Sequence, residues 1–224
     1  MMLRQVQFSD RREAGRSLAV ALAEFKNANP VILALPRGGV PIGYEVATAL
    51  DAPLDIILVR KLGAPGHEEY GIGAIVDGAS PQVVLDDEIV RMVGASPDYI
   101  DREVQRQLAE IERRRTAYGS GLAIPLEYRT AIVVDDGIAT GGTVKAALKA
   151  LRKTGVSRVI LAVPVAPRSA IAELRQWCDD IVCLAMPEPF YAVGAHYRDF
   201  SQTSDNEVVD LLAAARSDSE THKE

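Results

Sequence analysis

Short runs of apolar residues alternate along this chain with segments in which apolar residues recur every three or four positions. A short unbroken apolar run is typical of a buried strand, and a spacing of three to four residues is typical of an amphipathic helix. The alternation favours an α/β fold: a mostly parallel, twisted sheet flanked by helices, with right-handed crossovers. The predicted strands lie at residues 31–35, 54–59, 72–76, 82–86, 131–134, 158–165 and 180–187.

The predicted helices begin at residues that commonly cap helices. Asp10 opens the first helix, and Glu13 three residues later completes a capping box. Ser96, followed by a proline, opens a long charged helix that runs to about Tyr118. Ser204, with Glu207 three residues later, caps a last helix that ends near residue 216. Further helices are expected at 41–50, 88–94, 141–154 and 168–177.

The long helix carries a narrow apolar stripe with a spacing close to 3.5 residues, and Arg115 interrupts it. One interpretation is a surface helix that packs on the sheet. The other is a seam against a second subunit, because such spacing is typical of helices that pair. The stripe consists of Ile100, Val104, Leu108, Ile111 and Tyr118.

The remaining segments have the composition of loops. Residues 62–71, LGAPGHEEYG, are expected to form a loop, and residues 188–202 are irregular and rich in aromatic residues. Residues 217–224 are polar and predict a disordered tail. No internal repeat or interdomain linker is visible, so residues 1–216 are expected to form a single domain.

Composition narrows the class of protein. The formal net charge of −6 and the pI near 5.2 argue against a nucleic-acid partner, which usually binds a basic patch. No apolar run approaches the length that spans a bilayer, and the first residues lack the apolar core of a signal peptide. With two cysteines, a reduced cytoplasmic protein is expected. The three histidines are far apart in sequence and do not predict a zinc site.

The stretch AIVVDDGIATGGT, residues 131–143, places two adjacent aspartates directly after a strand. The loop that follows them precedes a helix N-terminus, where backbone N–H groups and the helix dipole favour a phosphate. Thr140 and Thr143 add hydroxyl donors, and the glycines at 141 and 142 let a ligand approach the backbone. The order is neither a Walker A loop nor a dinucleotide-binding fingerprint. A ligand with a phosphate at one end and a diol or Mg²⁺ near its middle fits both parts, as ribose 5-phosphate does.

This stretch resembles the signature of the type I phosphoribosyltransferases, which bind 5-phosphoribosyl 1-pyrophosphate (PRPP). The resemblance implies that Asp135 and Asp136 bind the ribose hydroxyls, directly or through Mg²⁺ and water. It also implies the type I phosphoribosyltransferase fold. Gly137 departs from the pattern, since the family usually has an apolar residue there, and it is expected to loosen the turn. The residues implied to hold the 5′-phosphate are Ala139, Thr140, Gly141, Gly142 and Thr143.

Two earlier segments are similar to further loops of this family. LPRGGVP, residues 35–41, resembles the pyrophosphate loop, in which Arg37 would supply a forked donor. The resemblance also implies a cis peptide bond between Pro36 and Arg37. An Arg-Gly-Gly turn without a ligand is the alternative. Gly38 and Gly39 would supply backbone N–H groups to the pyrophosphate.

VRKLGAPGHEEYG, residues 59–71, resembles the mobile loop that closes over PRPP. By this resemblance Arg60 and Lys61 would neutralise the leaving pyrophosphate. The acidic loop tip at His67, Glu68 and Glu69 is expected to be solvated surface. Together with the two other motifs, this segment implies a catalytic set that comprises Arg37, Lys61, Asp135 and Asp136.

The family places its variable hood after the last strand, here at about residues 187–203. Phe190, Tyr191 and Tyr197 are the candidate acceptor-binding residues, because aromatic rings can stack on a base. A packed flap or a dimer contact is the alternative for this aromatic group. The helical insertion at about residues 77–129 departs from compact salvage enzymes, and the family resemblance implies a homodimer.

The function implied is Mg²⁺-dependent transfer of the 5-phosphoribosyl group from PRPP to a nitrogenous, nucleobase-like acceptor. The alternatives are a non-catalytic PRPP or nucleotide sensor, a relative of PRPP synthetases and, for the acid pair alone, a receiver-type site. The absence of a second repeat and of an ATP loop disfavours a synthetase. The sequence does not identify the acceptor.

Overall fold

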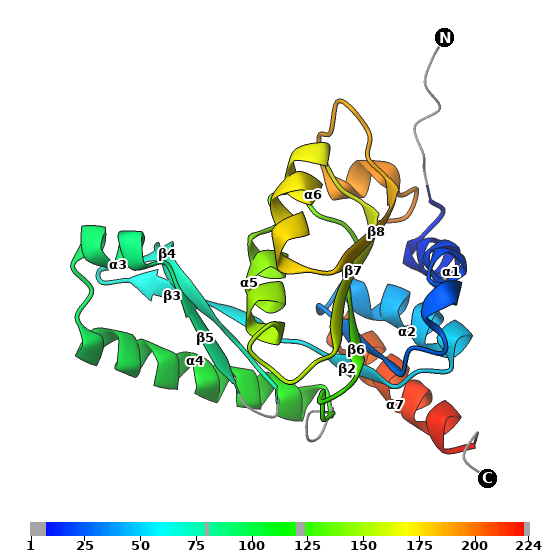
Figure 1. Ribbon diagram of the computed structural model, residues 1–224, viewed down its shortest axis with the longest axis horizontal. Coiled ribbons are helices and arrows are strands. Elements are labelled where there is room, and N and C mark those ends of the chain that lie inside the picture. Colours follow the sequence, from blue (N-terminus) through cyan, green and yellow to red (C-terminus); the bar gives the residue numbers. More distant parts are fainter. Residues whose placement is uncertain (1–7, 79–80, 120–123, 222–224) are drawn as a thin grey trace.

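The computed structural model describes residues 8–78, 81–119 and 124–221. Within these residues, the centre of the molecule is a five-stranded parallel sheet in the order β2-β1-β6-β7-β8 (Figure 1). The order places β1 beside β6, so the chain builds outward in both directions from that pair. The strands are β1 (Pro30–Ala34), β2 (Leu54–Ile56), β6 (Thr130–Val134), β7 (Arg158–Val165) and β8 (Asp180–Ala185).

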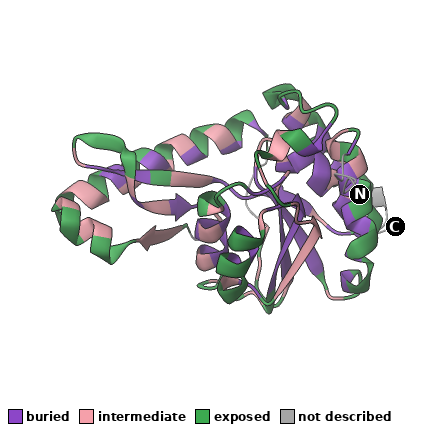
Figure 2. Cartoon of the chain, turned by 90° about the horizontal axis from the view of Figure 1, so that it is seen from above, coloured by how far each residue is buried: buried purple, intermediate pink, exposed green. Residues whose placement is uncertain are grey.

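Helices cover both faces of this sheet because its strands are apolar on both sides. In β6, Ile132 and Val134 pack into the cluster on one face, and Ala131 and Val133 pack into the cluster on the other. All four are fully buried, and Figure 2 shows the buried residues gathered around the sheet. The first face is covered by α1 (Arg11–Ala21), α2 (Gly39–Leu50) and α7 (Asp205–Thr221), and the second by α5 (Gly142–Leu151) and α6 (Arg168–Leu174). Short 3₁₀ turns lie at Ala23–Phe25, Arg175–Trp177 and Val193–His196.

A second group of elements projects from the sheet as an arm, which comprises residues 59–117 (Figure 1). Three antiparallel strands pair in the order β3-β4-β5, and α4 packs on β3 and β4. The prediction of a loop at residues 62–71 is therefore wrong, because β3 and β4 continue through this segment to a tight turn between Ala64 and His67. The elements are β3 (Val59–Ala64), β4 (His67–Val76), β5 (Gln82–Leu85), α3 (Asp87–Val93) and α4 (Pro97–Ala117). Within the predicted insertion at about residues 77–129, the described elements are the expected strand β5 and the helices α3 and α4.

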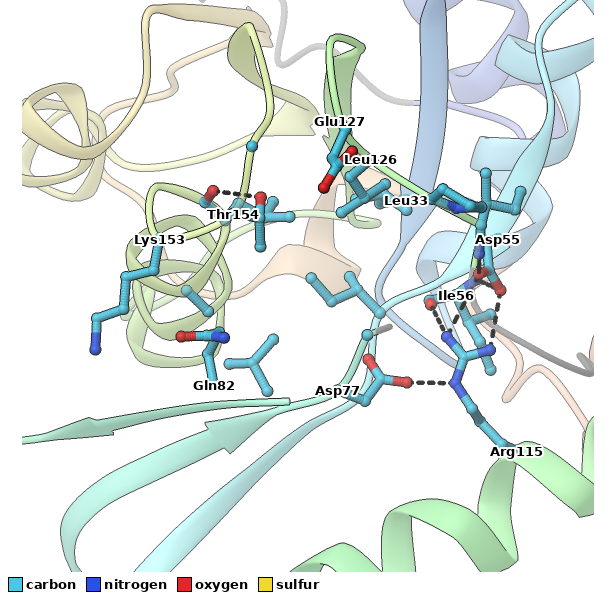
Figure 3. A pocket seen from close by; sticks show the side chains of 18 residues that line it. Leu33, Asp55, Ile56, Asp77, Gln82, Arg115, Leu126, Glu127, Lys153 and Thr154 are labelled. Atoms are coloured by element: carbon cyan, nitrogen blue, oxygen red, sulfur yellow. Dashed lines mark hydrogen bonds and ion pairs between the residues drawn. The ribbon is translucent and has the colours of Figure 1, made fainter. Parts of the chain in front are cut away.

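The base of the arm is fastened to the sheet by a buried cluster of three charged residues, called here the arm-root cluster (Figure 3). Arg115 of α4 donates from Nε to Asp77 Oδ2 at 2.6 Å, and its Nη1 lies 3.4 Å from Asp55 Oδ1. Asp77 follows β4 and Asp55 lies in β2, so the cluster joins the arm to the central sheet. Beside it is a cavity of about 320 Å³ with a mainly apolar floor that includes Leu33, Ile57 and Leu151.

The long helix begins where the sequence predicts, and polar side chains are buried beside its apolar stripe. Ser96 Oγ accepts the N–H of Tyr99, and the helix starts at Pro97. Its buried residues are Glu103, Gln107, Ile111 and Arg115, whereas Ile100, Val104 and Leu108 are only partly buried. The expected apolar stripe does pack on the core, since Ile111 and Tyr118 are buried and the other three residues pack against the same cluster. The stripe did not include the polar residues that are buried beside it on this helix.

The other helix limits differ only in detail, except at the C-terminal end. Asp10 caps α1 by accepting the N–H of Glu13 at 2.8 Å, and the Glu13 carboxylate accepts the N–H of Ser9 rather than that of the cap. The last helix, α7, continues to Thr221, so the disordered tail is wrong for residues 217–221. Residues 222–224 lie outside the described residues. No helix among the described residues is long and apolar enough to span a membrane.

Candidate active site

The loops that follow β1 and β6 meet at the carboxyl edge of the sheet. The two strands pair in parallel up to Ala34 and Val134, and the N–H of Leu35 donates to the carbonyl of Val134 at 2.9 Å. At Gly38 the two loops are in direct contact, since a Cβ on this residue would lie 2.1 Å from Oδ2 of Asp136. Two segments a hundred residues apart thus meet here, and any side chain at Gly38 would displace the Asp136 carboxylate.

The two aspartates of the acid pair, Asp135 and Asp136, use one carboxylate oxygen each for contacts within the protein. Oδ2 of Asp136 accepts from Arg11, with 2.9 Å to Nε and 2.8 Å to Nη2. Oδ1 of Asp135 accepts the backbone N–H of Asp136 at 2.8 Å. Within the described residues, Oδ1 of Asp136 and Oδ2 of Asp135 have no hydrogen-bond partner. The pair therefore offers two acceptor oxygens to a ligand.

The electrostatics of the acid pair favour binding of hydroxyl groups or a cation. Burial raises the pKa of Asp135 well above its ordinary value, and the negative charge of Asp136 raises it further. Burial also raises the pKa of Asp136, against the opposing effect of Arg11. Two adjacent half-buried carboxyl groups resist full ionisation, and a donor or a positive charge placed between them relieves that cost.

The loop after the acid pair leads into the N-terminus of α5. Gly141 is the N-cap, and no side chain caps the first turn. Its orphan N–H groups are therefore available to an anion, which the helix dipole also favours. Thr140 and Thr143 are exposed, and neither side chain has a hydrogen bond to another described residue. The predicted phosphate loop, with Ala139 and Gly142 also exposed, is thus open to a ligand.

The PRGG segment, residues 36–39, has the predicted cis peptide bond between Pro36 and Arg37. The Arg37 side chain is 35% exposed, and its Nη1 lies 3.7 Å from Oδ1 of Asp205 at the start of α7. In this structure the N–H of Gly39, predicted to face a ligand, donates to the carbonyl of Leu35 at 3.0 Å. The N–H of Gly38 donates to no backbone carbonyl among the described residues.

Gly137, the departure from the family pattern, has a packing role. It has φ +157°, and a Cβ would lie 2.6 Å from Cγ1 of Val193 and 2.9 Å from Cγ1 of Val165. Val193 belongs to the hood segment and Val165 to β7. The expected loosening of the turn is therefore not seen, because this glycine lets the hood segment pack closely against the acid pair.

Arg60 and Lys61 lie in β3 of the arm and contact arm residues. Arg60 donates from Nε to Oε1 of Gln107 at 2.9 Å. Lys61 donates from Nζ to the carbonyl of Glu69 at 2.7 Å and lies 3.2 Å from its carboxylate. Among the described residues, no hydrogen bond or ion pair joins either cation to the acid pair or the PRGG segment. The segment predicted to be a mobile loop is a paired hairpin in this structure.

The hood segment, residues 187–203, covers the acid pair. The hydroxyl of Tyr197 donates to the backbone carbonyl of Asp136 at 2.6 Å, and burial raises the pKa of this tyrosine. Tyr197 is thus a buried support rather than an open stacking surface. Phe190 stacks on His196, with ring centroids 5.5 Å apart. Tyr191 is 78% exposed and is the most accessible of the three candidate acceptor residues.

Sequence reasoning missed two residues of this region, Arg11 and His196. Arg11 lies in the first turn of α1, 125 positions before its partner Asp136, and no motif surrounds it. His196 is 1% exposed, and neither ring nitrogen has a hydrogen-bond partner among the described residues. Its only signal in the sequence was its place among the aromatic residues of the hood segment.

The acid pair fits a Mg²⁺ ion that is shared with a ligand. Among the described residues, no group of three or more histidine, cysteine, aspartate or glutamate side chains could hold a metal ion alone. Mg²⁺, however, usually binds proteins through one or two carboxylates, together with substrate phosphates and water. The two open oxygens of Asp135 and Asp136 match that pattern.

Comparisons with known proteins agree with this geometry. The model of the family "Phosphoribosyl transferase domain" matches residues 11–198. Two proteins of Mycobacterium tuberculosis, each named "Putative phosphoribosyl transferase" (MT0597 and Rv0571c), are 47% identical over 212 residues, which cover 94% of this chain and 47% of each relative. The chain thus spans about half the length of these curated relatives.

A solved structure, TT1426 from Thermus thermophilus, is 40% identical, with a TM-score of 0.81, and the match covers 93% of this chain and 98% of that one. The expected α/β architecture, a mostly parallel sheet flanked by helices, is confirmed and is the type I phosphoribosyltransferase fold. The family match includes the PRGG segment, the acid pair and the phosphate loop. This chain belongs to the phosphoribosyl transferase domain family.

Proposed function

We propose that this chain transfers the 5-phosphoribosyl group of PRPP to a nitrogenous, nucleobase-like acceptor and releases pyrophosphate. The observation that carries the proposal is the pair of open oxygens on Asp135 and Asp136 beside an uncapped helix N-terminus. A ribose 5-phosphate unit has hydroxyls and a phosphate in the same order. Family membership supports PRPP as the donor.

Each segment has a distinct task in this proposal. The loop formed by residues 139–143 would hold the 5′-phosphate with the N–H groups of α5 and the hydroxyls of Thr140 and Thr143. Asp135 and Asp136 would accept hydrogen bonds from the ribose hydroxyls. Arg37 would donate to the pyrophosphate through its forked guanidinium, with the Gly38 N–H as a further donor.

In the reaction, the bond between C1′ and the pyrophosphate oxygen breaks while the acceptor nitrogen forms a bond to C1′ from the opposite face. The electron pair of the broken bond stays on the pyrophosphate, and the acceptor nitrogen loses its proton. Negative charge therefore grows on the leaving group, where preorganised donors such as Arg37 stabilise the transition state. Mg²⁺, held by the open oxygens of the acid pair directly or through water, would supply further positive charge there.

Two regions would complete the site. Arg60 and Lys61 must release Gln107 and Glu69 before they can reach pyrophosphate, so the arm hairpin would have to change its contacts. The hood segment would bind the acceptor, with Tyr191 exposed and Phe190 stacked on His196. We further propose that the chain works in the cytoplasm as a homodimer and without a membrane partner. Its acidic composition disfavours a nucleic-acid partner.

The test is pyrophosphate release from PRPP and Mg²⁺ with a panel of purine bases, pyrimidine bases and simple amines. PRPP affinity is measured in parallel by calorimetry. Release with at least one acceptor supports the proposal. PRPP binding without release from any acceptor would instead support a non-catalytic PRPP sensor. No binding of PRPP or of any nucleoside monophosphate would reject both functions.

A further inference from the structure

Arg11 uses all three of its guanidinium nitrogens to join parts of the proposed site. Nε and Nη2 donate to Oδ2 of Asp136, and Nη1 donates to the carbonyl of Ser201 at 2.7 Å. The side chain is 12% exposed although it lies in the first turn of a surface helix. The guanidinium carbon also lies 4.1 Å from the centroid of the Phe200 ring. A single side chain thus contacts the acid pair and the hood segment at once.

Further contacts lead from the hood segment back to Asp136. Phe200 packs against Tyr197, with ring centroids 5.1 Å apart, and the hydroxyl of Tyr197 donates to the carbonyl of Asp136. Arg11 contacts the Asp136 carboxylate, and the Asp136 carbonyl accepts from Tyr197. Tyr197 packs on Phe200, and Phe200 packs on the guanidinium of Arg11. Asp136 is therefore held to the hood by its side chain and by its backbone.

The geometry at Asp136 decides which of its oxygens a ligand can use. Arg11 contacts Oδ2 twice, and Gly38 packs against the same oxygen. Oδ1 has no partner among the described residues. Two guanidinium donors that converge on Oδ2 hold that oxygen from two directions, whereas an ammonium group would supply a single point charge.

We infer that Arg11 is a positioning residue of this site: it fixes Asp136 with Oδ1 open to a ribose hydroxyl and couples that orientation to the hood segment. The inference rests on the proposed function, because the hydroxyl belongs to the PRPP that we propose as donor. Its consequence is that occupancy of the acid pair and the order of the hood segment depend on one another through Arg11.

The first arm of the test is a double-mutant cycle on ligand affinity, with ribose 5-phosphate and PRPP as probes in calorimetry. Arg11→Ala should weaken both affinities about tenfold, the effect expected when a charge-assisted contact is lost. In the Asp136→Asn background the same change should cost less than about twofold, because Arg11 acts through Asp136. Equal losses in both backgrounds would overturn the inference.

Two variants separate positioning from charge and from general stability. Arg11→Lys keeps the charge but not the fork, so it should not restore affinity. Arg12→Ala is the matched control, since Arg12 is the next residue of α1 and pairs with Glu45 on the surface. It should leave both affinities unchanged. Rescue by lysine, or an equal loss in the Arg12 variant, would count against a positioning role.

The second arm measures the hood segment without any ligand. The amides of Arg198 and Asp199 donate to the carbonyls of Phe8 and Ser9, so both are expected to be protected from hydrogen exchange. Arg11→Ala should raise their exchange rates several-fold, and Arg12→Ala should not. If the wild-type chain binds neither probe, the proposed function fails, and this arm alone decides the link between Arg11 and the hood segment. Unchanged exchange in the Arg11 variant would then overturn it.

Discussion

The acid pair and the arm-root cluster each hold two aspartates against one arginine, and they differ in how many oxygens remain open. In the arm-root cluster, Asp77 accepts the N–H of Leu58 at 2.7 Å and Nε of Arg115 at 2.6 Å. Both oxygens of Asp55 are also used, by Arg115 and by the N–H groups of Ile56 and Ile124 (Figure 3).

In the acid pair, by contrast, two of the four oxygens have no partner among the described residues. Buried polar groups in folded proteins are nearly always hydrogen-bonded, so a set of charges that is fully partnered needs no ligand. A set that is half partnered beside an uncapped helix has capacity left for one. The comparison assigns the arm-root cluster to stability and the acid pair to binding, and the predictions below test that division.

The largest effect is expected at the arm root. Arg115→Leu leaves two buried carboxylates without their cation, so the free energy of unfolding should fall by about 3–5 kcal/mol. Denaturant unfolding measures this, and the neighbouring Arg114→Leu, which loses only an exposed ion pair with Glu110, should change it by less than about 1 kcal/mol. An Arg115 variant as stable as the Arg114 variant would contradict the structural role.

A change in the acid pair should have the opposite outcome. Asp135→Asn keeps an oxygen to accept the N–H of Asp136 and removes one of two repelling charges, so stability should be unchanged or slightly higher. PRPP affinity should fall about 100-fold, because hydrogen bonds to charged groups contribute about 1.5–3 kcal/mol each. Calorimetry and thermal unfolding are compared with Asp210→Asn, an exposed site on α7. Lost stability with intact PRPP affinity would reverse the assignment.

Arg37 extends the comparison to a cation that has few polar contacts within the protein. Among the described residues, Arg37 has one ion-pair contact, in which its Nη1 lies 3.7 Å from the exposed Asp205. Arg37→Ala should therefore lower the free energy of unfolding by less than about 1 kcal/mol. Turnover should fall about 100-fold or more and exceed the loss of PRPP affinity, because removal of one preorganised donor costs about 3 kcal/mol in the transition state. Steady-state kinetics and calorimetry test this, with the exposed Arg175→Ala as a control. Equally small losses in both would reject the role of Arg37.

The last prediction concerns the pH dependence of the arm root. Burial raises the pKa of Asp77 from 3.8 to about 6, against the opposing effect of Arg115. Between these values the folded state holds a proton that the unfolded chain has lost, so this group's contribution to stability decreases as pH rises through the window. The decrease amounts to about 3 kcal/mol, since one pKa unit corresponds to about 1.4 kcal/mol and the shift is about two units.

Unfolding free energies at several pH values between about 4 and 7 measure this slope. Asp77→Asn should lack the decrease, whereas the exposed Asp101→Asn should retain it. A wild-type slope that persists in the Asp77 variant would show that another group is responsible.

The sequence predicted the carboxyl edge of the sheet well because its signals are local. The strand, the acid pair and the loop before α5 lie within thirteen consecutive residues, and the structure has them in that order. The tip of the arm hairpin, residues 62–71, was missed for the opposite reason. Its strands include glycines and charged, exposed residues such as Glu68 and Glu69, so no alternation of apolar residues marked them. Its proline-glycine turn was visible, but such turns occur in loops as well.

The two arginines show where sequence reasoning ends. Arg115 was noticed only as an interruption of an apolar stripe, and that interruption was the signal of a buried cation. Its partners Asp55 and Asp77 lie 60 and 38 positions away. Arg11 gave no signal, since a charged residue after a helix cap is ordinary on a surface. Both pairings are products of the tertiary fold and have no local pattern to reveal them.

The contact of Gly38 with Asp136 has a consequence for anyone who would redesign this protein. A side chain at Gly38 would displace the Asp136 carboxylate from the position in which Arg11 holds it, so substitution there would disturb the acid pair. Substitutions at Tyr191 of the hood segment meet no such constraint, because 78% of this residue's surface is exposed. Libraries that aim at a new acceptor should therefore vary Tyr191 and leave Gly38 unchanged.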